Sequence, residues 1–438
     1  MARFPRRSQY DDAVRERTAT PARVDPTIMT LSSVLFFGVF LCLWALMHVW
    51  VGRRLILRGR AYPRWARRMI VGVLVALAVV PVLAVFGRRL DVAAADLDLL
   101  QWIGFVFMGV STLLIALTMI VDTPRLLAQG WLALRKRWSA ARGQPSTDPR
   151  ADRQPDLVSP PRRQFFADLA NYGIVGGATG LSVAGFAEAR RVPRVVEVDV
   201  PVSDLHPDLD GLRIVQLTDV HIGPTIRGTW LSQVVDVVNS LEPDLVALTG
   251  DFVDGFVADL GPELAALSRV RARHGAFFVT GNHEYYWDGP AWCAAIGALG
   301  PTVLINEHRV IERGAARLLL AGVADLGAGR HEPSHGSDPI KAKAGAPAHD
   351  FSLLLAHQPR SIYAAAKAGF DLQLSGHTHA GQYFPMSLMI HLMQPYVHGL
   401  AQHEDMQIYV SAGTGYWGPP NRAGSPSEIT LLTLRRAS

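Results

Sequence analysis

The sequence predicts a group of N-terminal transmembrane α-helices followed by an α/β domain. The first third of the chain contains three long runs without Asp, Glu, Lys or Arg. From about Val195, short apolar runs alternate with helical patterns, as in α/β domains. Five of these later runs end in Asp, His or Asn, which is typical of a site at the carboxyl ends of strands. The composition agrees with a membrane-bound protein, because 49% of the residues are hydrophobic and only 18% are charged.

The three uncharged runs are each long enough to cross a bilayer. A hydrocarbon core of roughly 30 Å needs about 20 apolar residues in a helix. We predict a polar tail over residues 1–27 and three membrane helices over residues 28–121. The uncharged runs are Met29–Val51, Met69–Gly87 and Leu99–Val121. The protein is therefore expected to be a multi-pass protein of the cell (inner) membrane, with the lipid bilayer as a partner.

A weaker apolar segment follows the third run. Residues 122–163 form a basic, Pro-rich linker, and residues 164–194 contain a candidate fourth membrane helix. An Arg-Arg-Gln-Phe-Phe sequence begins at Arg162 and resembles the twin-arginine export signal. Because the chain contains other Arg-Arg pairs, the alternative is that this similarity to an export signal arises by chance. Residues 169–187 either span the membrane, are cleaved or pack without crossing, and the sequence leaves these outcomes open.

The distribution of arginine predicts the orientation in the membrane. The loop Gly52–Arg68 holds seven arginines and no acidic residue, which places it in the cytoplasm. If the fourth segment crosses the membrane, the C-terminal domain lies on the outer, periplasmic face, and this is the orientation that we expect. If it does not cross, the domain is cytoplasmic. Since membrane topology accounts for the net charge of +5, no nucleic acid partner is expected.

Polar clusters follow five predicted strands of the C-terminal domain, residues 195–438. The strands are 213–218, 244–249, 276–280, 351–356 and 370–374, and the clusters are Asp219-Val220-His221, Gly250-Asp251 with Asp254, Gly281-Asn282-His283-Glu284, His357 and Gly376-His377-Thr378-His379. Each cluster alone has a plainer explanation, such as a helix cap or a packed histidine. Five in succession predict a metal site without thiolate, since the two cysteines, Cys42 and Cys293, stand outside these clusters.

This series resembles the calcineurin-like metallophosphoesterases. Their order of motifs is Asp-x-His, Gly-Asp-x-x-Asp, Gly-Asn-His-Glu, a lone His and Gly-His-x-His, and all are present between residues 195 and 436. The sequence is most similar to the membrane-anchored bacterial branch, the YkuE/YaeI-like phosphoesterases. The resemblance implies a four-layer αββα sandwich and a metal-dependent phosphoric ester or anhydride hydrolase. It also implies two divalent metal ions, Mn, Fe or Zn, which provide a metal-bound hydroxide.

The resemblance assigns each motif residue to the binuclear centre. The metal ligands are Asp219, His221, Asp251 and His379 for one ion, and Asp251, Asn282, His357 and His377 for the other. Asp251 bridges the two ions and is therefore one catalytic residue. His283 is the other, as a proton donor or charge stabiliser over the phosphate. Asp254 and Glu284 are expected to orient the ligands.

We predict that the protein hydrolyses a phosphodiester or pyrophosphate bond, with a lipid-linked molecule as the candidate substrate. Two alternatives stay open: a phosphoesterase for soluble nucleotides and a non-catalytic metal-binding membrane sensor. Residues 385–400 are unusually apolar, and either pack into the core or form a lip that faces acyl chains beside the site. The other histidines lack a strand-end context and are interpreted as surface or packing residues: His274, His308, His331, His335, His391, His398 and His403.

Overall fold

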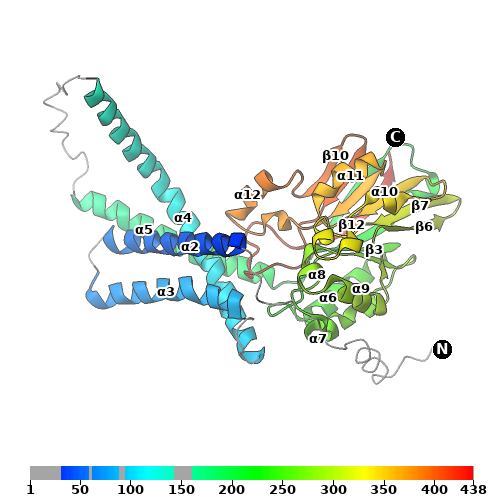
Figure 1. Cartoon of the computed structure of the whole chain (residues 1–438), viewed down its shortest axis with the longest axis horizontal. Helices are drawn as coiled ribbons and strands as arrows, with labels where there is room; N and C mark the ends of the chain where they lie inside the picture. The colour runs from blue at the N-terminus through cyan, green and yellow to red at the C-terminus, as the bar shows by residue number, and fades with distance from the viewer. Residues whose placement is uncertain (1–30, 59–61, 88–93, 143–159, 438) are drawn as a thin grey trace. The chain divides into compact units, whose positions relative to one another are not determined.

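The computed structural model describes residues 31–58, 62–87, 94–142 and 160–437 (Figure 1). Residues 51–438 form one compact unit, and the residues before them form a second unit that is described by itself. The predicted polar tail, residues 1–27, lies outside the described residues. Neither described cysteine, Cys42 nor Cys293, is in a disulfide.

Long helices precede the strands, as the sequence predicts. They are α2 (Leu31–Leu57), α3 (Arg64–Phe86), α4 (Ala94–Ala141) and α5 (Pro160–Ala189). Among the described residues, three helical stretches are long and apolar enough to span a membrane, namely Leu35–Leu57, Arg64–Phe86 and Leu97–Ser139. These confirm the three predicted apolar helices. α4 continues beyond Val121, so the first part of the predicted linker is helical. α5 is not among the three stretches, and its crossing of the membrane stays a prediction.

Polar contacts join the ends of these helices. Arg54 and Arg58, near the end of α2, both pair with Asp122 of α4, and the Arg58–Asp122 distance is 2.7 Å. The Asn171 side chain of α5 donates a hydrogen bond to the Arg58 carbonyl at 2.6 Å. An apolar cluster that includes Leu113 and Ile174 packs nearby. α4 and α5 therefore meet the arginine-rich end of α2 at defined positions.

The C-terminal domain is built on two six-stranded sheets. The first has the order β1-β12-β2-β3-β4-β5 and the second β10-β11-β9-β8-β7-β6. The strands of the first sheet are β1 (Arg194–Val202), β2 (Arg213–Leu217), β3 (Leu245–Thr249), β4 (Ala276–Val279), β5 (Thr302–Val303) and β12 (Glu428–Arg436). Those of the second are β6 (Glu307–Arg313), β7 (Ala316–Gly322), β8 (Phe351–Leu355), β9 (Leu372–Ser375), β10 (Gly399–His403) and β11 (Met406–Val410).

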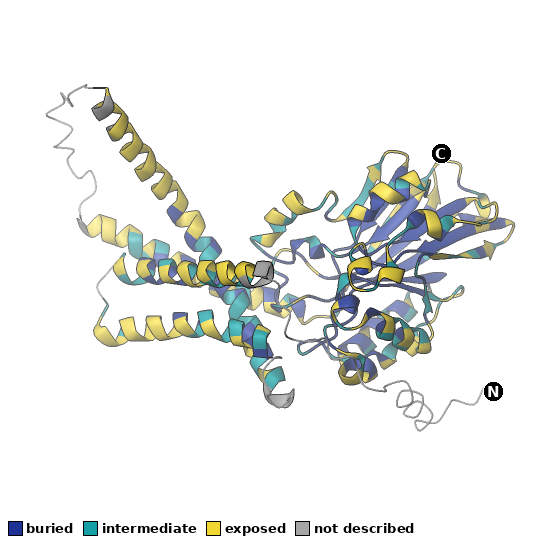
Figure 2. Cartoon of the chain, viewed as in Figure 1, coloured by how far each residue is buried: buried dark blue, intermediate teal, exposed yellow. Residues whose placement is uncertain are grey.

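Three apolar clusters bind the layers together. Ile214, Leu320 and Leu374 belong to the cluster between the two sheets. The outer face of the first sheet is covered by α6 (Gly228–Ser240) and α9 (Gly289–Ala298), and that of the second by α10 (Pro339–Lys343) and α11 (Ile362–Lys367). Figure 2 shows the strands as the most buried part of the domain. The predicted four-layer αββα sandwich is confirmed.

The five strands predicted before the polar clusters are all present. They are β2, β3 and β4 of the first sheet and β8 and β9 of the second. Neighbouring strands among them run parallel. Their carboxyl ends therefore meet at one edge of each sheet. The segment between β3 and β4 contains a short α-helix, α7 (Val257–Leu260), followed by a 3-10 helix, Gly261–Arg269. Pro262 at its start has no N–H to donate to a backbone carbonyl.

Candidate metal centre

The first group of potential ligands is formed by Asp219, His221 and His379. Asp219 and His221 follow β2, and His379 follows β9. One ligand atom from each side chain lies within 4.8 Å of the others. His379 Nε2 is 3.2 Å from Asp219 Oδ1 and 3.1 Å from His221 Nε2. The structure thus brings together three of the four side chains predicted for one metal.

The second group is formed by Asp251, His357 and His377, at the ends of β3, β8 and β9. Its ligand atoms also lie within 4.8 Å of one another. Asp251 Oδ2 is 3.1 Å from His357 Nε2 in this group and 3.9 Å from His221 Nε2 in the first group. The Asp251 carboxylate therefore stands between the two groups, where a bridging ligand is needed.

Most of the predicted ligands have a strained backbone. The φ angles are 54° at Asp219, 53° at His221, 56° at Asp251, 70° at His377 and 51° at His379. This left-handed region is uncommon for residues other than glycine, and each instance costs about 1–3 kcal/mol. Ligand carboxylates hold the neighbouring backbone in place: His377 N donates to Asp219 Oδ2 at 2.9 Å, and His283 N donates to Asp251 Oδ1 at 2.8 Å. Such strain characterises functional sites.

Buried polar atoms test whether these residues fit metal ions. Asn282 Oδ1 is buried and has no hydrogen-bond partner among the described residues, and the buried His357 Nε2 makes no well-aligned hydrogen bond there, although Asp251 Oδ2 lies 3.1 Å away. The other ends of both side chains are engaged, since Asn282 Nδ2 donates to Tyr286 Oη at 3.2 Å and His357 Nδ1 donates to the Thr249 carbonyl at 2.8 Å. The amide oxygen and Nε2 are therefore left for a metal. Oxygen and imidazole donors without thiolate suit Mn, Fe or Zn.

His283 lies beside both groups. Its Nδ1 is 2.5 Å from Asp254 Oδ1, and its Nε2 is 3.9 Å from Asp251 Oδ2. Burial opposes protonation of His283, but the carboxylates of Asp251 and Asp254 outweigh it and raise its pKa to about 9. Asp254 Oδ2 is also 3.3 Å from His221 Nδ1, so one carboxylate orients two imidazoles. His221, Asp254 and His283 could themselves hold a metal ion, which makes ligation by His283 the alternative to proton donation.

Charges are balanced within the centre. Burial alone raises the pKa of the Asp219 and Asp251 carboxyls, but the imidazoles, chiefly His379 and His357 respectively, bring both well below the ordinary value. Burial is the main cause that lowers the pKa of His377 and of His379 to about 4. These four groups are therefore carboxylates and neutral imidazoles, the forms that bind metal ions.

Glu284 has a different role from the ligands. Burial and the Asp251 charge raise the pKa of Glu284 to about 7. Its carboxyl accepts hydrogen bonds from the backbone N–H of Asp251 at 3.0 Å, Phe252 at 2.7 Å and Gly281 at 2.6 Å. Glu284 thus ties the loop after β3 to the loop after β4, and so positions the Asp251 carboxylate relative to Asn282.

Comparison with known proteins agrees with this geometry. The family model described as Calcineurin-like phosphoesterase matches residues 212–381. A protein from Helicobacter pylori (strain J99), named Uncharacterized metallophosphoesterase, is 37% identical over 277 residues, which cover 63% of this chain and 73% of that protein. The chain belongs to the calcineurin-like phosphoesterases.

Two further relatives place this phosphoesterase more broadly. A Transmembrane protein with metallophosphoesterase domain from Bos taurus is 43% identical over 270 residues, covering 59% of this chain and 61% of that protein. The chain thus spans about three fifths of that relative's length. YkuE from Bacillus subtilis is 27% identical over 286 residues, covering 63% of this chain and 97% of that protein. Because the relatives include both vertebrate and bacterial proteins, the bacterial branch stays a prediction.

Arg422 is a site residue of this phosphoesterase that sequence reasoning missed. Its side chain is fully buried, and its Nη2 is 3.1 Å from His379 Nδ1. It donates hydrogen bonds to the carbonyls of His379 at 3.0 Å and Ala412 at 2.8 Å, and also to Gly415. Burial lowers its pKa to about 10, so it stays cationic at neutral pH. A sequence signal existed, since Arg422 is the only charged residue between Asp405 and Glu428.

Replacing Arg422 with methionine should destabilise the domain and weaken the first metal group. The change leaves several buried carbonyls without a donor, each worth about 1–3 kcal/mol. We expect a Tm several degrees lower and a lower metal content, because His379 loses its support. Arg435→Met is the matched control, since Arg435 is exposed and its side chain pairs with Asp199 at the surface. Equal Tm and metal content in the two variants would contradict a supporting role for Arg422.

Aromatic side chains flank His283 at the surface. The ring of His283 lies 5.0 Å from that of Tyr286 and 5.5 Å from that of Trp417. Both flanking rings are about half exposed. Gln382 fixes the Trp417 backbone, because its amide oxygen accepts from Trp417 N at 2.9 Å and its Nε2 donates to Trp417 O at 3.0 Å. Trp417 and the segment that carries it therefore form one side of the site beside His283.

The apolar segment after the metal motif forms helix α12 (Met386–Met393). None of its residues is buried. Leu388 is 65% exposed and Leu392 89% exposed, and Figure 2 shows α12 as an exposed helix. The interpretation of this helix as part of the core is therefore wrong. Tyr383 and Phe384, just before α12, instead pack with Leu113 of α4 and Ile174 of α5.

Proposed function

We propose that this phosphoesterase hydrolyses a phosphodiester or pyrophosphate bond at a centre of two divalent metal ions. The observation that carries the proposal is the pair of ligand groups on either side of Asp251. Asp219, His221, Asp251 and His379 would hold one ion, and Asp251, Asn282, His357 and His377 the other. When bound, such ions neutralise phosphate charge and activate water as a nucleophile at neutral pH.

His283 and Asp254 would act on the leaving group. Asp254 holds the His283 ring through Nδ1 and leaves Nε2 free to face the reacting phosphate. A protonated imidazole in that place donates a hydrogen bond to the departing oxygen and stabilises its charge. Glu284 keeps the two ligand loops in register. This division of roles supports an enzyme over a non-catalytic sensor, which needs only the ligands.

The substrate that we propose is lipid-linked. α12 supports this choice, because it exposes a nearly continuous apolar surface shortly after the His379 loop. The residues just before α12 pack against α4 and α5. An exposed apolar helix next to membrane helices suits the interface between headgroups and acyl chains. A substrate held in the bilayer could then reach the site without leaving the membrane.

Replacing Leu388 and Leu392 with serine tests the lipid-linked substrate. The full-length double variant, in detergent micelles, should show a KM about tenfold higher for a long-chain lipid pyrophosphate, because two apolar contacts are lost. Hydrolysis of bis(p-nitrophenyl) phosphate should not change. Ile340→Ser is the matched control, since Ile340 is also 65% exposed but lies on α10. Faster turnover of soluble nucleotides than of any lipid substrate would favour the soluble-nucleotide alternative, and turnover of neither would favour the sensor.

We also propose that the catalytic domain lies on the outer, periplasmic face of the cell membrane. Two contacts of α5 support this orientation. Asn171 binds the Arg58 carbonyl at the arginine-rich end of α2, whereas the Gly185 carbonyl accepts a hydrogen bond from Arg422 of the catalytic domain. Residues 171 and 185 are about 21 Å apart along a helix. The arginine-rich loop therefore contacts α5 near its middle and the catalytic domain contacts it near its C-terminal end, and arginine-rich loops stay in the cytoplasm.

The same orientation makes Arg162 and Arg163, at the start of α5, accessible to a cytoplasmic export apparatus. Replacing both with lysine should keep the catalytic domain from reaching the outer face if they act as a twin-arginine signal. A reporter enzyme fused after residue 438, active only outside, should lose its activity. Arg190 and Arg191, replaced with lysine at the other end of α5, provide the control pair. An unchanged reporter in the first variant would show that the signal is a chance match.

A further inference from the structure

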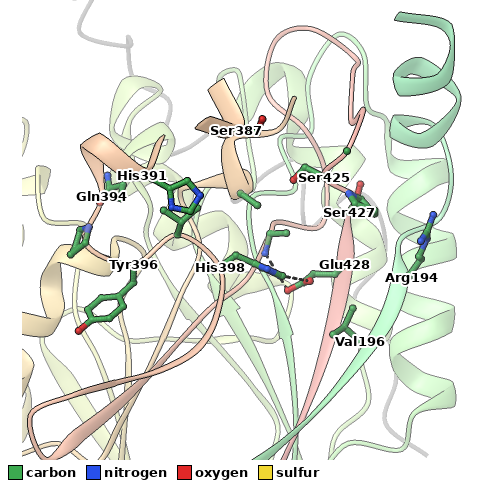
Figure 3. Close-up of a pocket in the computed structure, with 16 residues that line it drawn as sticks. Arg194, Val196, Ser387, His391, Gln394, Tyr396, His398, Ser425, Ser427 and Glu428 are labelled. Carbon is green, nitrogen blue, oxygen red and sulfur yellow. Dashed lines mark hydrogen bonds and ion pairs between the residues drawn. The ribbon is translucent and has the colours of Figure 1, made fainter. Parts of the chain in front are cut away.

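A cavity separate from the candidate metal centre lies beside the loop that carries His379. Its volume is about 740 Å³, and its walls come from the ends of both sheets and from α12. Val196 of β1 and Glu428 of β12 belong to the first sheet, and Ala412 follows β11 of the second. None of the predicted metal ligands lines it, although Ala380, next to His379, forms part of one wall. Figure 3 shows the cavity with the His398–Glu428 pair near its centre.

The polar side chains of this cavity are mainly hydrogen-bond donors, and the guanidinium of Arg194 is a permanent cation. They include Arg194, His391 and His398, with hydroxyl groups such as that of Ser427. Glu428, the only carboxylate in the lining, is already engaged. It accepts hydrogen bonds from Tyr409 Oη at 2.9 Å, Ala412 N at 3.1 Å and Thr430 Oγ1 at 3.0 Å, and pairs with His398 Nε2 at 3.1 Å. A cation would find no free acid here, so the lining suits an anion.

The cavity is also suited to more than an inorganic ion. Its volume is far greater than a single phosphate fills. Gln394 Oε1, in the wall, is buried and has no hydrogen-bond donor among the described residues. A hydroxyl group on an organic headgroup would supply that donor.

α12 forms one wall of this cavity and is exposed on its other side. Ser387 and His391 stand one helical turn apart and line the cavity, whereas Leu388 and Leu392, also one turn apart, are highly exposed. Arg360 donates a hydrogen bond to the Met393 carbonyl at 2.6 Å and so caps the end of the helix. Arg194 enters the cavity five residues after α5 ends at Ala189. One helix thus offers a polar face to the cavity and an apolar surface to its surroundings.

We propose that this cavity binds the phosphate-bearing headgroup of an anionic membrane lipid, at a site separate from the reaction centre. The headgroup phosphate pairs with Arg194, which Figure 3 shows on the wall opposite His391, while His391 donates a hydrogen bond to an ester carbonyl of the lipid and the acyl chains pass along the exposed side of α12. The bound lipid holds α12, and with it the His379 loop, against the bilayer surface. This site does not depend on which bond the metal centre hydrolyses.

Binding of a lipid analogue to the full-length protein tests this site. The protein, with its metals, is placed in phosphatidylcholine nanodiscs and titrated by calorimetry with the phosphonate analogue of dihexanoyl phosphatidic acid, whose carbon–phosphorus bond a phosphoesterase cannot hydrolyse. We expect saturable binding that the double variant Arg194→Gln, His391→Gln weakens by about tenfold or more. Ser387→Phe, which narrows the cavity without removing a charge, should weaken it as well.

Arg191→Gln separates a specific site from general attraction to charge. Arg191 and Arg194 both pair with Glu188, at 3.2 Å and 3.0 Å, and are similarly exposed, but only Arg194 lines the cavity. Arg191→Gln should leave binding unchanged. Equal losses in the two arginine variants, or no saturable binding to the wild type, would overturn the proposal. Inorganic phosphate that binds as tightly and with the same sensitivity to Arg194→Gln would overturn the lipid assignment. Unchanged hydrolysis of bis(p-nitrophenyl) phosphate would show that the variants are folded.

Discussion

Replacing Asp251 with asparagine should abolish turnover and reduce the binding of both metal ions. The Asp251 carboxylate stands between the two ligand groups, 3.1 Å from His357 Nε2 and 3.9 Å from His221 Nε2. An asparagine amide is neutral and offers one oxygen, whereas the carboxylate offers two oxygens that share a negative charge. We expect a loss of about 10³-fold or more in kcat/KM, since the substitution removes charge stabilisation and ligation together. Metal content of the purified protein and the rate with an aryl phosphodiester measure the two effects.

Asp254→Asn is the informative comparison for this variant. Asp254 contacts His221 Nδ1 and His283 Nδ1 but stands outside the ligand set predicted from the sequence. Its asparagine variant should keep two metal ions and lose rate, because the two imidazoles lose their orienting carboxylate. If Asp251→Asn keeps both metals at near wild-type rate, the bridging assignment is wrong. If Asp254→Asn loses metal to the same extent, Asp254 is itself a ligand.

The positions of the candidate ligands could be predicted because they depend on local order along the chain. Each stands just after an apolar strand, and strands of an α/β fold direct their carboxyl ends to one edge. β2, β3, β4, β8 and β9 all end where the sequence placed them, to within about two residues. The pattern near each strand end indicated His357, the resemblance assigned it to the second metal, and the structure places its Nε2 3.1 Å from Asp251 Oδ2.

The parts that could not be predicted depend on contacts between distant segments. Arg422 reaches His379 only because β12 inserts between β1 and β2, which brings the last part of the chain back to the site. Asp254 meets His283 through a turn that no periodicity describes. The left-handed backbone at Asp219 and Asp251 likewise leaves no trace in residue type, because glycine, the usual residue there, cannot bind a metal.

The apolar character of α12 had two explanations that composition alone could not separate. Met, Leu and Ile at helical spacing are typical of a helix that packs into a core, and that was one of the two predictions. The structure leaves Leu388 and Leu392 exposed, because the outer face of the second sheet is already covered by α10 and α11. Whether α12 is buried therefore depends on which other helices already cover the sheet.

Asn282 and His283 are neighbours in the chain, yet their alanine variants should fail in different ways. Asn282 Oδ1 is buried without a hydrogen-bond partner among the described residues, as a metal ligand requires. Asn282→Ala should therefore lose the second metal first, and excess metal should restore part of the rate. His283 already has a partner for one ring nitrogen, because its Nδ1 lies 2.5 Å from Asp254 Oδ1. His283→Ala should keep two metals while kcat falls by about 10²–10⁴-fold.

The leaving group separates the two variants further. If His283 donates a proton or a hydrogen bond to the departing oxygen, its loss matters less when that oxygen is already a good leaving group. Rates of the two variants across aryl phosphodiesters of graded leaving-group pKa should therefore diverge. His283→Ala should recover toward the wild-type rate as the leaving-group pKa falls, whereas Asn282→Ala should stay impaired by the same factor throughout. Loss of metal from His283→Ala to the extent seen in Asn282→Ala would make the group of His221, Asp254 and His283 a metal site, and His283 a ligand.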